Sequence, residues 1–340
     1  MNQRKNAAVV IVVVLGLLVW LYPLVGNAAW IREPVSIPLN CNHPGETIGG
    51  YLDRLRPGDT LLVTGTCREN VLIPAQFLNI TLNGQGTATI DGPDVTNPTV
   101  QINGSGITIQ GFNITGGAQG IQVDHGGQAY ITGNVIYGTS DDAVGLYRHS
   151  SARINGNTTH DTALGIAVKE GSEARIFNNT IERVNGHCIE VREGSSARIG
   201  INSTGDTTPS PNTISTCNGN GILVRLHSDA TIGGNTISNS HNGVDIEDTS
   251  EAVVAGNTIQ GNSGNGIHIA GSGLTIGTSF NVGFANVLNY TAPGELNGGY
   301  GIQCDFGGYI LGLQGTAPNS LNGAHGRRNL DPTCINELSD

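Results

Sequence analysis

Apolar and polar residues alternate over short stretches along most of the chain, and these stretches return at nearly constant intervals. Residues 230–251 read ATIGGNTISNSHNGVDIEDTSE, and residues 252–273 repeat the scheme as AVVAGNTIQGNSGNGIHIAGSG. Alternation with a period of two indicates β-strands, and together with the frequent glycines it excludes an amphipathic helix of period 3.6. The pattern therefore predicts a chain of short strands arranged in repeated units.

Two kinds of position keep a fixed place in the repeat. The first is an asparagine, which recurs at residues 113, 134, 157, 179, 212, 235, 257, 286 and 319. The second is a four-residue strand with two apolar positions, which recurs as GIQV from 120, AVGL from 143, GIAV from 165, CIEV from 188, GILV from 221, GVDI from 243, GIHI from 266 and GIQC from 301.

A repeat this short cannot bury its own apolar face, so its stability must come from stacking on its neighbours. Leucine-rich repeats have a similar length, but their L-x-x-L-x-L pattern is absent. We therefore predict an all-β fold, a single-domain parallel β-solenoid in which each coil adds about 4.8 Å. The recurring Ile and Val residues would stack in columns, and the asparagines would form a buried ladder at one corner.

The irregular parts of the chain predict loops and caps. The Gly-, Pro- and Ser-rich segments 203–211 and 289–298 interrupt the repeat and are expected to project from it. Within 46–74, a short amphipathic helix should end at Pro57-Gly58 and precede a strand. These features predict an N-terminal cap with this helix over 30–58, a solenoid over 59–325 and a closing C-terminal cap or tail over 326–340.

Residues 1–29 are typical of an export segment. A basic start, MNQRKN, precedes an apolar run from Ala7 to Val25 and the small-residue exit GNAAW. The run allows two interpretations: a signal peptide cleaved near Ala28 or Ala29, or an uncleaved anchor, since it is long enough to cross a bilayer. Both place the rest of the chain outside the cytoplasm, in the periplasm, in the medium or on the cell surface.

The cysteines and the net charge indicate how the chain is cross-linked and which ligands it binds. In an exported chain, six cysteines without a C-x-x-C pair favour disulfides over metal ligands, although free buried thiols remain an alternative. The predicted pairing is sequential, 41–67, 188–217 and 304–334, which is one of 15 connectivities. The formal net charge of −11 argues against a nucleic-acid partner.

Several stretches together resemble the right-handed parallel β-helix repeat proteins of the pectin-lyase-like superfamily. They are PGDTLLVTGTCRENV, ITLNGQGTATIDG and the repeated A-x-I-x-G-N-x-I and N-G-I-x-V, and the resemblance covers roughly residues 46–325. It implies a single-stranded right-handed parallel β-helix. It says less about chemistry, because the superfamily includes lyases, hydrolases, epimerases, adhesins and other exported proteins.

Two columns of basic side chains are predicted to point outward. Lys169, Arg192 and Arg225 follow the G-I-x-V strands of consecutive coils, beside Tyr147 and its neighbour Arg148. The second column lies four residues before the asparagines and contains Tyr130, Arg153, Arg175, Arg198, Thr231 and Val253. Stacked like charges repel, so each column needs nearby carboxylates or an anionic ligand. The first column has Glu170, Glu190 and Glu193 close in sequence, and ordinary solvated Arg–Glu pairs would also explain it.

The first column also suggests a carbohydrate site. Its cations would line a groove and bind the carboxylates of an acidic polysaccharide, with Arg225 and Arg148 among the contacts and Tyr147 stacking on a sugar. β-Elimination requires a base for the proton α to the carboxylate and a cation for the enolate. In related lyases Arg or Lys can serve as base, a role that Lys169 or Arg192 could fill here. The full set of candidate catalytic residues is Lys169, Arg192, Glu190 and His187.

Other candidate residues have weaker support. Asp141, Asp142 and His187 are similar to the paired aspartates and histidine of polygalacturonase-like glycosidases. However, His187 falls two coils from Asp142. The alternative interpretation is that these residues are ordinary turn aspartates and a surface histidine without a catalytic role. The histidines of Asp124-His125, His149 and His227 end strands and could transfer protons or simply be solvated. No metal ligand is assigned, although an acidic patch could bind calcium: Asp245, Glu247, Asp248 and Glu251.

The sequence thus predicts an exported, monomeric β-helix that binds or processes an acidic polysaccharide, with lyase-type elimination as the candidate reaction and glycoside hydrolysis as another. The competing hypothesis is a noncatalytic surface or structural β-helix, or an adhesin, whose outward charges only keep it soluble. No P-loop, dinucleotide fingerprint, HExxH or serine-elbow motif supports another enzyme class.

Overall fold

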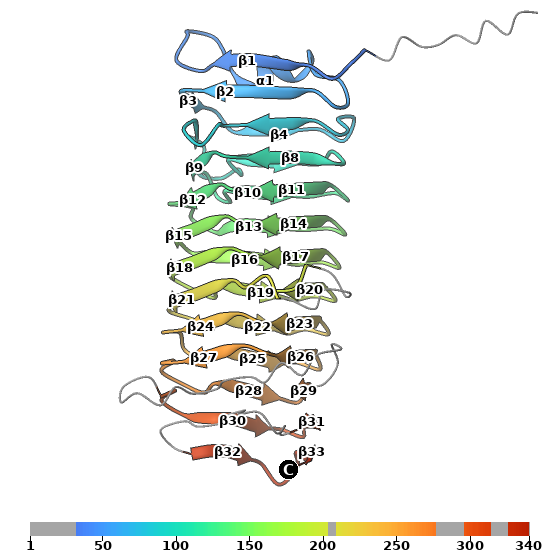
Figure 1. Ribbon diagram of the computed structural model, residues 1–340, viewed down its shortest axis with the longest axis vertical. Helices are drawn as coiled ribbons and strands as arrows, with labels where there is room; N and C mark the ends of the chain where they lie inside the picture. Colours follow the sequence, from blue (N-terminus) through green and yellow to red (C-terminus); the bar gives the residue numbers. More distant parts are fainter. Residues whose placement is uncertain (1–31, 203–208, 277–295, 314–325, 340) are drawn as a thin grey trace, which may run out of the picture. The chain divides into compact units, whose positions relative to one another are not determined.

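The computed structural model describes residues 32–202, 209–276, 296–313 and 326–339, and the folded unit spans Pro34–Asp340. In this unit the strands form three sheets, each paired in parallel and each visited once per coil, so that successive coils stack in chain order (Figure 1). This is the parallel β-helix that the repeat predicts. We name the 13-stranded sheet A, the 9-stranded sheet B and the 11-stranded sheet C.

The strands are short, as the repeat length requires. Sheet A contains β1 (Ser36–Asn40), β2 (Thr60–Thr64), β5 (Thr81–Asn83), β8 (Ile107–Gln110), β11 (Gln128–Thr132), β14 (Ser151–Asn155), β17 (Glu173–Phe177), β20 (Ser196–Ile199), β23 (Asp229–Gly233), β26 (Glu251–Ala255), β29 (Gly273–Ile276), β31 (Tyr309–Leu313) and β33 (Ile335–Ser339). Sheet B contains β3 (Thr66–Arg68), β6 (Thr89–Gly92), β9 (Asn113–Gly116), β12 (Val135–Tyr137), β15 (Thr158–Thr162), β18 (Thr180–Val184), β21 (Thr213–Cys217), β24 (Thr236–Ser238) and β27 (Thr258–Gln260). Sheet C contains β4 (Val71–Ile73), β7 (Val100–Ile102), β10 (Ile121–Val123), β13 (Asp142–Leu146), β16 (Leu164–Val168), β19 (Ile189–Val191), β22 (Ile222–Val224), β25 (Val244–Glu247), β28 (Ile267–Ala270), β30 (Tyr300–Asp305) and β32 (Gly326–Leu330).

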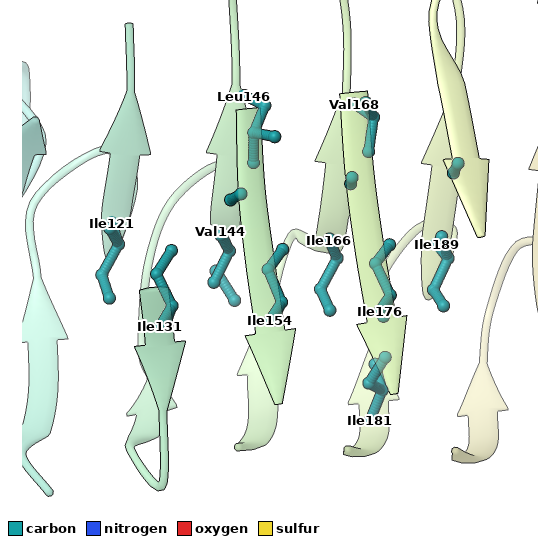
Figure 2. Packing of buried hydrophobic residues seen from close by; sticks show 14 of the residues in the cluster. Ile121, Ile131, Val144, Leu146, Ile154, Ile166, Val168, Ile176, Ile181 and Ile189 are labelled. Carbon is teal, nitrogen blue, oxygen red and sulfur yellow. The ribbon is translucent and has the colours of Figure 1, made fainter. Parts of the chain in front are cut away.

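The core consists of vertical columns of aliphatic side chains. Ile166 of β16 pairs in register with Ile189 of β19, which pairs with Ile222 of β22, and these side chains are almost wholly buried. Figure 2 shows the same row of sheet C and a second row from sheet A, Ile131, Ile154 and Ile176. The predicted register is confirmed, so residues at equivalent positions of consecutive coils are direct neighbours.

The corner between sheets A and B holds the predicted asparagine ladder, formed by Asn134, Asn157, Asn179, Asn212, Asn235 and Asn257. Asn212 is representative, since its Oδ1 accepts from the backbone N–H of Asn179 at 2.9 Å and its Nδ2 donates to the Ile176 carbonyl at 2.9 Å. The prediction was wrong at residue 113, because Phe112 occupies that corner and its N–H donates to Asn134. Residues 286 and 319 lie outside the described residues.

A second ladder, which we did not predict, lies at the corner between sheets C and A. Serine hydroxyl oxygens accept the backbone N–H of the preceding coil's serine, as Ser172 Oγ does from Ser150 at 3.1 Å. The members whose hydroxyls accept in this way are Ser172, Ser195, Ser228, Ser250 and Ser272. Both ladders satisfy backbone groups that the sharp turns would otherwise leave unpaired in a buried place.

The N-terminal end matches the expected helix followed by a strand, although the helix is short. Helix α1 (Ile48–Leu52) begins after Thr47, whose hydroxyl accepts from the Gly50 N–H at 3.0 Å. Ile48 and Leu52 are buried in the core at this end, which is the contact that a cap requires. Strand β1 adds to sheet A before β2, so the region expected as a cap also contributes one sheet strand.

The three disulfides join Cys41 to Cys67, Cys188 to Cys217 and Cys304 to Cys334, as predicted. At the C-terminal end, β32 and β33 extend sheets C and A, so the strands continue past residue 325 into the segment expected as a tail. The expected projecting loops, 203–211 and 289–298, fall largely outside the described residues. Residues 7–25 also lie outside the described residues. None of the described helices has the length and apolar character needed to cross a membrane.

Candidate functional site

Sheet C brings most of the predicted site residues onto one outer face. Leu146, Val168, Val191 and Val224 pair in register on consecutive coils, and the residue that follows each of them continues the column. These following residues are Tyr147, Lys169, Arg192 and Arg225, whose backbone N–H groups each donate to the preceding coil. The predicted column is therefore present, and its charges lie within reach of one another.

Asp142, Tyr147 and Lys169 form a buried cluster at the start of this column. Lys169 Nζ donates to Asp142 Oδ1 and Oδ2 at 3.1 and 3.0 Å and lies 3.3 Å from the Tyr147 hydroxyl. The Tyr147 hydroxyl donates to Asp142 Oδ2 at 2.5 Å. Asp142 is fully buried and Lys169 is 4% exposed, whereas Tyr147 is partly exposed. The phenol therefore connects a buried ion pair to the surface.

Burial sets the protonation of this cluster. It raises the pKa of Asp142 to about 6, against the opposing effect of the Lys169 ammonium. Burial and the neighbouring Asp142 carboxylate also raise the pKa of Tyr147, which keeps the phenol neutral. Asp142 can therefore exchange a proton near neutral pH through a phenol that holds its own proton.

Glu190, Arg192 and Arg225 form a second cluster on the next two coils. Glu190 is buried, and its Oε1 accepts from Arg225 Nε at 3.0 Å and lies 2.7 Å from Arg225 Nη2. Arg192 Nε lies 3.8 Å from both Glu190 and Glu193 and has no hydrogen-bond partner among the described residues despite being buried. Arg225 is thus firmly paired, whereas Arg192 retains an unused donor on the same face.

A third cluster surrounds Asp245 on β25, which the sequence analysis placed in an acidic patch without predicting its partners Asn220, Asn242 and His268. The Asp245 carboxylate accepts from Asn220 Nδ2 at 2.8 Å and from Asn242 Nδ2 at 3.0 Å, and its Oδ1 lies 2.7 Å from His268 Nδ1. The other ring nitrogen of His268 lies 3.2 Å from Asp305 Oδ2. The hydrogen bond to Asp245 raises the pKa of His268. The matching positions of Asp245 and His268 in the repeat were the available signal.

His187 lies beside the second and third clusters and does not contact Asp142. Its Nδ1 accepts from the Asn220 N–H at 3.0 Å, and burial lowers the pKa of the ring. Asp141, next to Asp142, accepts from Gln119 Nε2 at 2.8 Å. The structure therefore separates the aspartates from the histidine that glycosidase-like chemistry would combine.

Asp124 and Arg148 form a further ion pair near the Asp142 cluster. Asp124 is fully buried, and both Nε and Nη2 of Arg148 contact its two carboxylate oxygens. Burial opposes the ionised form, but the hydrogen bonds from Arg148 prevail and lower the pKa of Asp124. The other candidate proton-transfer histidines, His125, His149 and His227, are exposed at turns.

The acidic patch that could bind calcium is divided between two sheets. Glu247 follows Asp245 on sheet C, whereas Glu251 begins β26 of sheet A and accepts from the Tyr309 hydroxyl at 2.8 Å. Within the described ranges, the only close group of three possible ligands is Cys41, Cys67 and Glu69, and both cysteines are consumed by a disulfide. The patch thus does not form one site.

The second predicted column lies on the outer face of sheet A. Tyr130, Arg153, Arg175 and Arg198 pair in register, as expected, and two adjoining grooves run beside them. Neither groove is lined by Lys169, Arg192 or Arg225, along which we predicted one. Both of these grooves therefore lie on sheet A, beside the second column.

Comparison with known proteins identifies the fold. The sequence profile described as "Right handed beta helix region" matches residues 98–199 and 195–310. A search of curated protein sequences finds no match. Among solved structures, the chain is similar to the A-module of the Azotobacter vinelandii mannuronan C-5 epimerase AlgE4, with a TM-score of 0.54 and 14% identity over 82% of this chain and 86% of that one.

Two further structures have comparable coverage. A double mutant of the periplasmic alginate epimerase AlgG gives a TM-score of 0.51 at 14% identity, over 89% of this chain and 82% of that one. An alginate lyase from Paenibacillus gives a TM-score of 0.45 at 16% identity, over 80% of this chain and 98% of that one. Because the profile covers most of the chain and agrees with three parallel sheets, the protein belongs to the right-handed β-helix family.

Proposed function

We propose that the outer face of sheet C binds and processes an acidic polysaccharide. The observation that carries the proposal is the buried contact of Asp142 with both Lys169 and Tyr147. The names of the AlgE4 and AlgG neighbours refer to mannuronan and alginate, and uronates of this kind are the proposed substrate class. At such low identity the likeness supports the fold alone, so the proposal depends on the side chains.

Burial of ionic groups on this face argues for a functional role. Asp124, Asp142, Lys169 and Glu190 are all buried on sheet C. Removing paired charges from water costs free energy that an apolar pair of similar size would not incur, and an aliphatic column would stack equally well here. Clusters of this kind with a shifted pKa, as at Asp142, are enriched at active sites.

The clusters supply the parts that proton transfer at a uronate requires. We propose that Tyr147 oxygen takes the proton α to the substrate carboxylate while the phenol proton passes to Asp142. Arg192, whose side chain is 28% exposed on this face, would neutralise the substrate carboxylate as the enolate forms. Lys169, which the sequence suggested as a base, is a positioning group in this scheme because its ammonium is occupied by Asp142. Glu190 positions Arg225, and His187 lies at the edge of the same surface.

The fate of the enolate decides the reaction. If the carbon–oxygen bond of the glycosidic link breaks, the proton held by the Tyr147–Asp142 pair passes to the leaving oxygen, and an unsaturated sugar end remains. If instead a water molecule on the opposite face of the carbon donates a proton to it, the sugar is inverted, the chain stays intact, and the proton held by the Tyr147–Asp142 pair is released to solvent. Both outcomes begin with the same proton transfer, so the lyase reaction that we expect has an epimerase as its alternative.

The test is incubation of the purified chain with a panel of uronate polysaccharides, with and without calcium. Absorbance of unsaturated ends reports elimination, and new reducing ends without that absorbance report hydrolysis. Solvent deuterium incorporation into the sugar without new reducing ends reports proton exchange without cleavage. Tyr147→Phe should reduce the active signal about 100-fold or more, the usual size of an acid–base contribution. Arg192→Gln should also reduce it, because the substrate carboxylate would lose its cation.

Tyr137→Phe is the matched control, because Tyr137 is a partly buried tyrosine of sheet B whose ring stacks on His160. It should retain activity. Equal activity of wild type and Tyr147→Phe would contradict the assigned site. Flat signals in every assay, with no retention on a uronate gel, would instead favour the noncatalytic structural hypothesis.

The three disulfides fit a protein that folds in an oxidising compartment outside the cytoplasm. We propose that residues 1–29 direct the chain there, either as a cleaved signal or as an anchor. Cell fractionation followed by N-terminal sequencing of the mature chain distinguishes these two forms.

A further inference from the structure

Sheet A carries a second charged surface, which the proposed function does not use. Arg153 of β14 pairs in register with Arg175 of β17, which pairs with Arg198 of β20. The coils bring the three guanidinium groups into one column with a spacing of about 4.8 Å between strands. We call Arg153, Arg175 and Arg198 the arginine strip.

Within the ranges that the structure describes, the arginine strip has no carboxylate in ion-pair contact. Among the described residues, no Asp or Glu forms an ion pair with the strip, whereas such pairs are made by Arg68, Arg148, Arg183, Arg192 and Arg225. Arg153 instead contacts the side-chain oxygen of Asn202 and lies 5.7 Å from the centre of the Phe177 ring. Arg175 Nη1 reaches only the Asn202 carbonyl, at 3.5 Å. Three stacked cations therefore repel one another without an ion-pair partner in the part of the chain that the structure describes.

A shortage of acidic residues does not explain why the arginine strip has no ion-pair partner among the described residues. The chain has 27 Asp and Glu residues against 16 Lys and Arg, and cations on the other two sheets have taken carboxylate partners. On sheet B, Arg183 binds Asp161 at 3.1 Å and also contacts Glu182. A strip without such partners in a chain with net charge −11 is arranged to attract anions from solution.

The strip borders a groove of suitable form for an extended chain. The groove has a volume of about 400 Å³ and is lined by Tyr130, Gln128, Ser151, Arg153 and Arg175, among others. A second groove of about 300 Å³ shares Glu173 with the first and includes Arg198, but Asp229 and Glu251 also line it, so the first groove is the one suited to an anionic ligand. Tyr130 is 49% exposed at the end of the strip, so its ring is available for stacking.

We propose that the arginine strip is a binding site for an acidic glycan, separate from the sheet C face. Guanidinium groups bind carboxylate or sulfate groups along the chain, Tyr130 stacks on a sugar ring, and the groove's hydroxyl and amide side chains bind sugar hydroxyls. A nucleic acid also offers spaced anions, but the strongly negative remainder of the chain would repel that longer, denser polyanion. The site holds polymer without performing chemistry, so the inference does not rest on the proposed function.

Binding by the arginine strip is tested with defined oligosaccharides and calorimetry, in the full chain carrying Tyr147→Phe and Arg192→Gln, which prevent turnover and weaken uronate binding at sheet C. The probes are an oligouronate, a sulfated oligosaccharide and a neutral oligosaccharide of equal length. The triple variant Arg153→Gln, Arg175→Gln, Arg198→Gln should bind the anionic probes about tenfold or more weakly, with a smaller dependence on salt. Arg183→Gln, which removes a paired cation of sheet B, should change the affinity less than about twofold.

Hydrogen exchange locates the bound probe. The oligouronate should protect β14 and β17 in the parent chain and leave them unprotected in the triple variant. The triple variant should fold, because it removes mutually repulsive charges and otherwise only the partly exposed contacts of Arg153 and Arg175 with Asn202 and of Arg153 with Phe177, and an unchanged or higher urea midpoint verifies this. Equal affinity of the parent and the triple variant would overturn the proposal, as would binding of the neutral probe or of single-stranded DNA with the affinity of the oligouronate.

Discussion

Lys169 Nζ lies 3.0 Å from Asp142 Oδ2, with side chains that are 5% and 0% exposed. The two residues are 27 positions apart in the chain, and they meet because β16 stacks directly on β13. The pair lies on the outward side of sheet C and is nevertheless buried. The effect of breaking this pair on the free energy of unfolding therefore measures how strongly the buried charges of sheet C depend on one another.

Replacing Lys169 with Met should destabilise the fold strongly. The change leaves the Asp142 carboxylate buried without its cation, and loss of one partner of a buried pair costs about 3–5 kcal/mol. Urea unfolding followed by circular dichroism measures the free energy of unfolding. The double variant Lys169→Met, Asp142→Asn should recover part of the loss. Arg183→Met, which breaks an exposed pair, should destabilise the fold far less than Lys169→Met.

The cost of Lys169→Met should depend on pH in a direction set by Asp142. The pKa of Asp142 is already raised from 3.8 to about 6, and loss of Lys169 removes the main opposing effect. A folded-state pKa above the unfolded value means that the folded state gains stability as the pH falls through it. The difference in unfolding free energy between wild type and variant should therefore be smaller at pH 5 than at pH 8. A difference that grows toward acid would contradict the assigned protonation.

The asparagine ladder should carry measurable stability at each member. Asn212→Ala leaves the Asn179 N–H and the Ile176 carbonyl without their side-chain partner inside the corner, which costs about 1–3 kcal/mol. Asn185→Ala provides the control, because Asn185 is exposed on a neighbouring turn, and it should shift the unfolding free energy by less than about 0.5 kcal/mol. Equal effects of the two variants in urea titrations would mean that the ladder hydrogen bonds add nothing.

His268 should contribute stability in acid and lose it toward alkaline pH. Its hydrogen bond to Asp245 raises the pKa above 6.5, so the folded state holds the proton more tightly than the unfolded state. The contribution is fully present below pH 6.5 and disappears as the pH rises through the folded-state pKa. Thermal unfolding of wild type and His268→Gln between pH 5.5 and pH 9, a range about the imidazole pKa, measures it. The stability gap between them should narrow with rising pH, and a widening gap would refute the assignment.

Positions that depend only on the repeat were predicted well. The stacking of Ile166, Ile189 and Ile222 and the ladder from Asn134 to Asn257 follow from equivalent positions on consecutive coils. The pairing of Cys188 with Cys217 was predicted only as one of three sequential disulfides, and it is confirmed. The prediction was wrong at residue 113, where the register is set by Phe112, because a large apolar side chain can occupy the same corner. The serine ladder was missed because serine is common in turns for local reasons as well.

The sequence by itself determined the coil, since a period of alternating apolar residues leaves stacking as the only way to bury them, and it also determined which residues share a column. Only the tertiary structure decided the partners within and between columns. Tyr147 bonds to Asp142, Arg225 takes Glu190, and Arg175 finds a backbone carbonyl in place of a carboxylate. The physical reason is that the repeat spacing fixes which coil and which column a side chain belongs to. Its hydrogen-bond or ion-pair partner depends in addition on the rotamer that it adopts and on which charged side chains of the neighbouring coils are buried.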